Sequence, residues 1–178
     1  NLNIGDVVLA SSWLKDSSKS GGGVLHQAGV HLINYIIDFV GMPDYVSADY
    51  HNYLLPESCG EDTAFCKMIY DNGPDVQIEA SYVNKVESNS EHIIIKGTNG
   101  SLYTDMKNSI IEITLNNGRK KQITISKDNT QQTIYREIKA LWQLLSKNKL
   151  PCTDLEDTIK TLQVVEAMNK SAKSKQKI

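Results

Sequence analysis

Apolar residues recur at helical spacing in the first third of the chain. Leu25, Ala28, Leu32, Ile36 and Phe39 follow one another every three or four residues, and Val30, Ile33 and Ile37 widen the apolar surface. Because apolar side chains cover much of the circumference, the pattern predicts a largely buried helix over residues 24–40. Gly41 and Pro43 follow, as expected just beyond the C-terminus of a helix.

The middle of the chain alternates apolar and polar residues with the period of a strand. Strand-like runs cover residues 64–70, 76–83, 92–96, 101–105, 111–115 and 121–126, and a further short run covers 4–10. Asn72-Gly73, Asn99-Gly100 and Asn117-Gly118 separate successive runs, and Asn-Gly is a strong signal for a tight hairpin. The middle is therefore expected to form an antiparallel sheet.

Two more helices are predicted at the end of the chain. Residues 131–146 place Ile134, Ile138, Leu141 and Leu145 on one face. The next helix is expected after Pro151, where Thr153-Asp154-Leu155-Glu156 fits a capping box, and its apolar face is Leu155, Ile159, Leu162, Val165 and Met168. A strand, a helix, hairpins and two helices predict an α+β fold, an open and largely antiparallel sheet with helices packed on one face.

Composition limits the class of protein further. With 178 residues, 40% of them apolar, and a net charge of −2, the chain fits one domain over residues 1–171, followed by a basic, solvated tail over 172–178. The charge does not suggest nucleic-acid binding, and no apolar run suggests a membrane span. Cys59, Cys66 and Cys152 lack zinc-site spacing, so we expect no metal site and a reducing, cytoplasmic location.

A polar stripe on the first predicted helix carries the candidate chemistry. At about 100° per residue, Gln27, His31, Asn34 and Asp38 fall within a narrow sector. The stripe is either the solvent face of a surface helix or the lining of a cleft. In a cleft, His31 could exchange protons with a ligand from a rigid element.

The residues around this helix add weaker signals. Gly21-Gly22-Gly23 at its start permits unusual backbone angles or the close approach of a ligand, although it is neither a dinucleotide fingerprint nor a phosphate loop. Trp13 could stack on a ring or pack internally, and Lys15 could meet an anion or lie free on the surface. His26 is expected to be a packing or surface histidine, and Glu57, Glu61 and Asp62 are expected to solvate a loop.

The order of these motifs resembles the C-terminal substrate domain of the Gfo/Idh/MocA family, the relatives of glucose–fructose oxidoreductase and inositol dehydrogenase. The family reads Trp, then Ser-Gly-Gly-Gly, then Asp-x-Gly-x-His-x-x-Asp. The matching residues are Trp13, Ser20-Gly21-Gly22-Gly23, Gln27-Ala28-Gly29-Val30-His31 and Asn34, followed by Glu61-Asp62-Thr63-Ala64, Tyr70-Asp71-Asn72-Gly73, Ile95-Lys96-Gly97-Thr98-Asn99-Gly100, Tyr135-Arg136-Glu137-Ile138 and Val165-Glu166-Ala167. The resemblance runs from about Ile4 to Ser171.

The resemblance implies an NAD- or NADP-dependent dehydrogenase. It implies hydride transfer between nicotinamide and a hydroxyl-bearing carbon of a sugar, a cyclitol or a nucleotide-sugar derivative, with His31 as the proton acceptor or donor. Gln27, Asn34, Trp13 and Lys15 are then expected to bind substrate, and Gly21 and Gly22 to contact the cofactor.

The same resemblance implies that part of the enzyme lies outside this chain. Family members hold the cofactor in an N-terminal Rossmann domain, which this chain lacks, so the chain alone is expected to be inactive. A homodimer or homotetramer formed through the sheet is also expected.

Two departures from the family pattern keep an alternative open. Gln27 and Asn34 stand where the family has acids, which retains hydrogen bonding and removes negative charge. The alternative is a non-catalytic binding or assembly module of the same fold.

Overall fold

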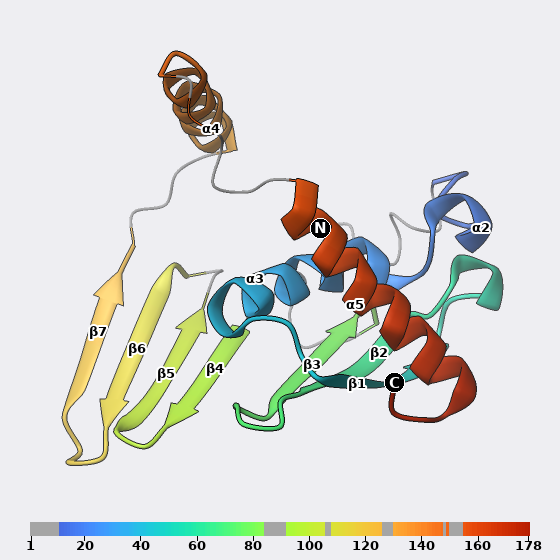
Figure 1. The fold of residues 1–178 in the computed structure, drawn as a ribbon, viewed down its shortest axis with the longest axis horizontal. Helices are drawn as coiled ribbons and strands as arrows, with labels where there is room; N and C mark the ends of the chain where they lie inside the picture. The colour runs from blue at the N-terminus through green and yellow to red at the C-terminus, as the bar shows by residue number, and fades with distance from the viewer. Residues whose placement is uncertain (1–10, 84–91, 106–107, 126–129, 148, 150–154) are drawn as a thin grey trace. The chain divides into compact units, whose positions relative to one another are not determined.

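The computed structural model describes residues 11–83, 92–105, 108–125, 130–147, 149 and 155–178. They form two compact units (Figure 1). Unit 1 combines Asn1–Val86 with Cys152–Ile178, and unit 2 is Glu87–Pro151. The predicted strand over residues 4–10 and the start of the predicted capping box lie outside the described residues.

Unit 1 contains a three-stranded antiparallel sheet. Its strands β1 (Tyr45–His51), β2 (Thr63–Ile69) and β3 (Val76–Ser81) lie in the order β1-β2-β3. Side chains alternate across the sheet, and the buried face includes Val46, Ala48, Ala64, Cys66, Met68, Ile78 and Ala80. The predicted hairpin through Asn72-Gly73 is confirmed as the link between β2 and β3, whereas β1 was not predicted.

The helices of unit 1 cover the buried face of this sheet. They are α2 (Ser17–Ser20), the π-helix η1 (Leu25–Gly29), α3 (Val30–Val40) and α5 (Leu155–Ser174), with a short 3₁₀ turn η2 (Glu57–Cys59) before β2. α5 packs against β1 and α3, and η1 packs against β3 (Figure 1). The side chains between these elements form the core of the unit.

The helix predicted over residues 24–40 exists, but only one of its faces is buried. Leu25, Gly29, Ile33 and Ile37, each four residues after the last, are buried, whereas Phe39 is 80% exposed. The apolar pattern alone could not distinguish a helix buried all round from one with an uncovered apolar face. The wide π turn at its start was not predicted either.

The apolar face predicted for α5 is correct in its second half and wrong in its first. Val165 and Met168 are buried, together with Val164 and Ala172, whereas Leu155, Ile159 and Leu162 are exposed. All buried residues of α5 lie between Thr161 and Ala172, which is the part of the helix that enters the core.

Residues 173–178 of the expected solvated tail are exposed, but the end of this segment is attached to β1. α5 continues to Ser174, and Val46 and Ile178 exchange both backbone hydrogen bonds. Lys175 pairs with Asp49, and the Lys177 ammonium lies 3.6 Å from the centre of the Tyr45 ring. The backbone pairing places the last residue against the edge strand of the sheet.

Unit 2 contains a four-stranded antiparallel sheet and one helix. The strands β4 (His92–Gly97), β5 (Gly100–Asp105), β6 (Ile110–Leu115) and β7 (Lys120–Thr124) follow in sequence order, so both remaining Asn-Gly hairpins are confirmed. The helix α4 (Thr130–Leu145) confirms the predicted helix over 131–146, and its predicted apolar face, Ile134, Ile138, Leu141 and Leu145, is exposed. The α+β class is thus confirmed, with the strands divided between two sheets.

Candidate functional site

The glycine run at the start of the first long helix allows a close backbone contact. A Cβ on Gly23 would lie 2.0 Å from the carbonyl oxygen of Glu61, and a Cβ on Gly60 would lie 2.5 Å from the Gly23 nitrogen. Gly21 ends α2 with φ +85°, a left-handed angle that favours glycine. The glycines therefore serve an internal contact, between the helix start and the residues that lead into β2.

Glu61 satisfies the first backbone donors of this helix. Its Oε2 accepts from the Gly23 N–H at 3.1 Å, its Oε1 accepts from the Leu25 N–H at 3.0 Å, and its backbone carbonyl accepts from the Val24 N–H at 2.8 Å. The first N–H groups of a helix have no partner within the helix, and a carboxylate there also complements the helix dipole. The prediction that Glu61 solvates a loop is wrong because its partners are contributed by a distant part of the chain.

Asp62 was also expected to be a solvated loop residue, and it is fully buried. Its Oδ2 accepts from the Leu54 and Leu55 N–H groups at 2.7 and 2.9 Å, and its Oδ1 accepts from the Thr63 hydroxyl. Burial acts to raise the pKa of the Asp62 carboxyl, but these hydrogen bonds outweigh it and hold the pKa below its usual value. Asp62 thus fixes the loop between β1 and β2.

Gln27 is held by two hydrogen bonds within unit 1. Its Nε2 donates to the Gly22 carbonyl at 2.9 Å, and its Oε1 accepts from the Tyr82 hydroxyl at 2.8 Å. Burial, with a smaller contribution from the charge of Glu61, raises the pKa of Tyr82 to about 12, so the phenol stays a donor at neutral pH. The amide group keeps a second N–H for a further partner.

The polar stripe predicted on the helix does not form one continuous solvent face. Gln27 lies on the π turn and contacts Tyr82 of unit 1, and Asn34 donates to the Thr161 hydroxyl of α5 at 3.1 Å. His31 and Asp38 are exposed. A π turn advances the chain by less than 100° per residue, so the regular spacing assumed for the stripe does not hold there.

His31 lies on the uncovered face of α3. It shares this face with Tyr35, 44% exposed, and Phe39, 80% exposed, while Ile33 and Ile37 fix the opposite face in the core. The helix therefore presents an accessible imidazole from a rigid support, beside aromatic surface that unit 1 leaves open.

Trp13 and Lys15 lie in the turn before α2, and both are exposed. Among the described residues, no hydrogen bond or ion pair joins either of them to His31. His26 is half-buried, and its ring lies over Gly21 and Gly22, as expected for a packing histidine.

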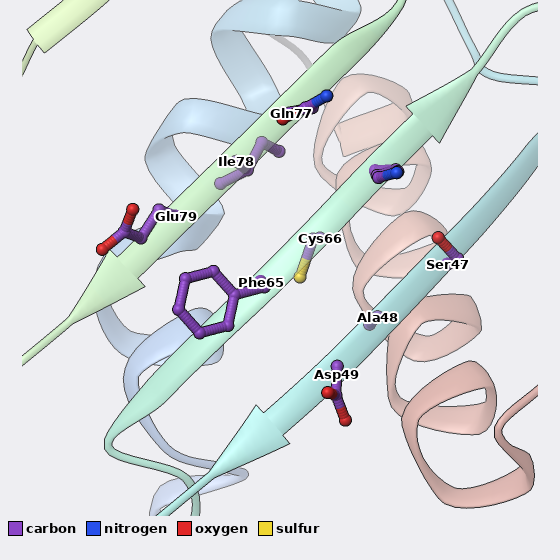
Figure 2. A pocket seen from close by; sticks show the side chains of 9 residues that line it. Ser47, Ala48, Asp49, Phe65, Cys66, Gln77, Ile78 and Glu79 are labelled. Atoms are coloured by element: carbon purple, nitrogen blue, oxygen red, sulfur yellow. The ribbon is translucent and has the colours of Figure 1, made fainter. Parts of the chain in front are cut away.

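The open face of the three-stranded sheet carries a shallow hollow of about 450 Å³. Figure 2 looks onto this face, where Asp49, Phe65 and Glu79 lie side by side on neighbouring strands and the helices lie behind the sheet. Lys67 lies in the next row of the same face, between Ser47 and Gln77. This surface is polar, charged and separate from the helix that carries His31.

Within the described part of the chain, no cluster of three or more His, Cys, Asp or Glu side chains could hold a metal ion. None of the described helices has the length and apolar character needed to cross a bilayer.

The described residues form an α+β fold with an accessible histidine on a helix, and comparison identifies the family. Residues 5–178 match the family described as "Oxidoreductase family, C-terminal alpha/beta domain". The chain belongs to this Gfo/Idh/MocA family, so the resemblance stated from the sequence motifs is confirmed. No curated protein matches the chain by sequence.

Solved structures of the same fold are about twice as long. A levoglucosan dehydrogenase in complex with NADH and levoglucosan is 16% identical, with a TM-score of 0.83 over 94% of this chain and 53% of its own. An Agrobacterium radiobacter oxidoreductase in complex with NAD⁺, L-tartaric acid and magnesium is 21% identical, with a TM-score of 0.79 over 97% of this chain and 53% of its own. The aldose–aldose oxidoreductase of Caulobacter crescentus is 18% identical, with a TM-score of 0.76 over 94% of this chain and 50% of its own. The chain thus spans about half the length of these structures.

Sequence reasoning missed Glu61 and Tyr82 as residues that organise the candidate site. Glu61 lies three residues before the predicted strand over 64–70 and reads as a surface acid, and Tyr82 lies near the end of the predicted strand over 76–83 without an obvious partner. The glycine run was the available signal, because adjacent glycines suggest that another backbone approaches closely.

Proposed function

We propose that this chain is the substrate-binding half of an NAD- or NADP-dependent dehydrogenase. The substrate class is a sugar, a cyclitol or a nucleotide-sugar derivative, and hydride moves between nicotinamide and a hydroxyl-bearing carbon. Family membership and the solved relatives, two of which are described with NADH or NAD⁺, support this proposal. The observation that carries it is the accessible His31 on a helix whose opposite face is fixed in the core.

His31 is the proposed proton acceptor or donor for the substrate hydroxyl. A histidine is suited to general acid–base work near neutral pH, and a rigid support keeps it at a constant distance from a bound ligand. Asn34 and Gln27 are proposed to hydrogen-bond the substrate through those side-chain amide donors and acceptors that are not used in their bonds within the protein. Trp13 is proposed to stack on a ring of the substrate, and Lys15 to bind an anionic group.

The dinucleotide contributes the hydride acceptor or donor, and most of its binding site must come from outside this chain. The described residues offer it the glycine turn, where Gly21 is exposed and bears no Cβ. We propose that Gly21 and Gly22 contact the cofactor there and that a Rossmann domain holds the rest. That domain would cover the open face of α3 around Tyr35 and Phe39.

The test uses the full-length protein with NAD⁺ or NADP⁺ and a panel of sugars and cyclitols. Absorbance of the reduced nicotinamide should appear with at least one substrate, and His31→Ala should lower turnover by about 100-fold, the scale of lost general-base catalysis. His92→Gln, an exposed histidine on β4, is the matched control and should leave turnover unchanged. Cofactor binding without turnover on any substrate would support the assembly module instead.

We further propose that two copies associate through the open face of the three-stranded sheet. Asp49, Phe65 and Glu79 form one row of this face (Figure 2). Ser47, Lys67 and Gln77 form the next row. A two-fold axis along the strands would place Lys67 over its own copy and Asp49 over Glu79. A two-fold axis across the strands instead places Lys67 over Phe65 of the second copy, between its two acids, which is the complementary arrangement.

The mass of the assembly in solution tests this interface. Lys67→Glu should shift the protein toward the monomer in light scattering after size exclusion, because it adds a third acid between Asp49 and Glu79 of the second copy. Lys173→Glu, an exposed residue of α5, is the control. A Lys67→Glu protein that assembles like the wild type would exclude this face as the interface.

The proposed cytoplasmic location is supported by the free, buried thiols of Cys59 and Cys66.

A further inference from the structure

The start of the helix that carries His31 is held from two sides. On one side, Glu61 accepts from the Gly23, Val24 and Leu25 N–H groups. On the other, Gln27 donates to the Gly22 carbonyl and is itself held by the Tyr82 hydroxyl. We call Glu61, Gln27 and Tyr82 the glycine clamp, because together they fix the backbone from Gly22 to Leu25.

We propose that the glycine clamp positions His31 relative to the glycine turn, and that Glu61 is its principal positioning residue. This inference rests on the proposed function, which assigns proton exchange to His31 and the cofactor contact to Gly21 and Gly22. None of the three clamp residues needs to touch the reacting atoms in this role. Glu61 and Tyr82 are the new assignments, and Gln27 acquires a positioning role through its bond to Gly22.

The π turn explains how the clamp reaches His31. η1 covers Leu25–Gly29, directly between the clamped backbone and the start of α3 at Val30. A π turn accommodates about one residue more per turn than an α-helix, so rewinding it would rotate the clamped end against His31 by roughly 100°. The Glu61 bonds to Gly23 and Leu25 straddle the entry to this turn and hold its backbone in place.

The other end of the helix is fixed independently. Asn34 bonds to Thr161 of α5, and Ile33 and Ile37 are buried in the core. With that end fixed, a loosened clamp moves the glycine turn rather than the whole helix. The distance between His31 and anything held at Gly21 or Gly22 then varies, which lowers the fraction of time spent in a reactive geometry.

The contacts around Glu61 leave little tolerance for another side chain. A Cβ on Gly23 would lie 2.7 Å from the Glu61 Oε2 as well as against its backbone. The carboxylate is also close enough to contribute, after burial, to the raised pKa values of Cys66 and Tyr82. Glu61 therefore acts as a charge held among fixed partners, unlike the exposed Glu57 four residues earlier.

Glu61→Gln in the full-length enzyme tests the proposal. The variant is isosteric, but it replaces one acceptor oxygen by an N–H that faces another N–H. We expect kcat to fall about 10- to 100-fold with KM within about threefold, because a misplaced catalytic group affects the chemical step more than ground-state binding. Faster hydrogen exchange at the Gly23 and Leu25 amides should accompany the loss. Glu57→Gln, the matched control, should change none of these quantities.

The outcomes separate this inference from the proposed function. If His31→Ala lowers turnover about 100-fold while folded Glu61→Gln keeps kcat within twofold of the wild type, the positioning role is wrong and the catalytic role of His31 stands. If His31→Ala has no effect, the proposed function fails first. If Glu61→Gln does not fold, Tyr82→Phe tests the proposal instead, because it removes only the hydroxyl that holds Gln27. A lower kcat at unchanged KM supports the glycine clamp, and an unchanged kcat overturns it.

Discussion

Replacing Asp62 should separate the contribution of a buried charge from that of its hydrogen bonds. Asp62→Asn can place its carbonyl oxygen where Oδ2 accepts from Leu54 and Leu55, and its amide nitrogen can donate to the Thr63 hydroxyl. The geometry survives and the charge is lost. A hydrogen bond to a charged group contributes about 1 kcal/mol more than a neutral one, so two such bonds predict a loss of about 2 kcal/mol.

Asp62→Ala removes the acceptor altogether. It leaves the buried Leu55 N–H without an acceptor in the protein, which costs about 1–3 kcal/mol beyond the lost bonds, so we expect about 4 kcal/mol in total. For a protein of this size, 1 kcal/mol corresponds to roughly 2–4 °C in Tm. Thermal and urea unfolding should therefore rank wild type, Asp62→Asn and Asp62→Ala in that order, with Glu57→Gln close to the wild type.

The advantage of aspartate over asparagine at position 62 should depend on pH in a definite direction. The pKa of the Asp62 carboxyl is lower in the folded protein than in the unfolded chain. The stabilisation is therefore fully present above the unfolded pKa of about 3.9 and is lost as the pH falls through the folded value. The stability gap between wild type and Asp62→Asn should close below about pH 4. A gap under about 0.5 kcal/mol at neutral pH, or one that persists in acid, would refute the reasoning.

Two further results are expected. Gly23→Ala should unfold or strongly destabilise the protein, because its Cβ would lie 2.0 Å from the Glu61 carbonyl oxygen. The control Gly97→Ala, whose Cβ would have nothing nearer than 3.8 Å, should cost under about 1 kcal/mol of stability. Equal melting temperatures of the two variants would contradict the close contact at Gly23. Burial, with a smaller contribution from Glu61, raises the pKa of the Cys66 thiol to about 12. Alkylation mapped by mass spectrometry should therefore modify Cys66 only in denaturant. Rapid alkylation of Cys66 in the native protein would contradict its burial.

The sequence predicted the elements that depend on local pattern. An Asn-Gly pair favours a tight turn between the two strands next to it in the sequence. The apolar spacing that predicted α3, α4 and α5 also involves only residues close together in the sequence. β1 was missed although Val46, Ala48 and Tyr50 alternate with polar residues, because Ala48 and Asp49 are residue types that strands disfavour. The exposed first half of α5 was misjudged because periodicity shows which face is apolar but not how far the core extends.

The candidate site was predictable only in part. The position of His31 on a helix followed from spacing, and its catalytic role stays a prediction. Glu61 and Asp62 were misread because their partners are decided by tertiary structure: Glu61 contacts backbone 38 residues away, and a charged pair before a strand looks the same in sequence whether it is buried or solvated. The π turn was also missed, since the apolar period across five residues does not distinguish it from an α turn.

Unit 1 is complete only when the ribosome has made residues 155–178. Its β1 pairs with Ile178, and its core takes Val164, Val165 and Met168 from α5, while residues 87–151 of unit 2 are made in between. During synthesis the sheet of unit 1 is therefore only partly covered, by the residues of η1 and α3 that share its core, until α5 has been made.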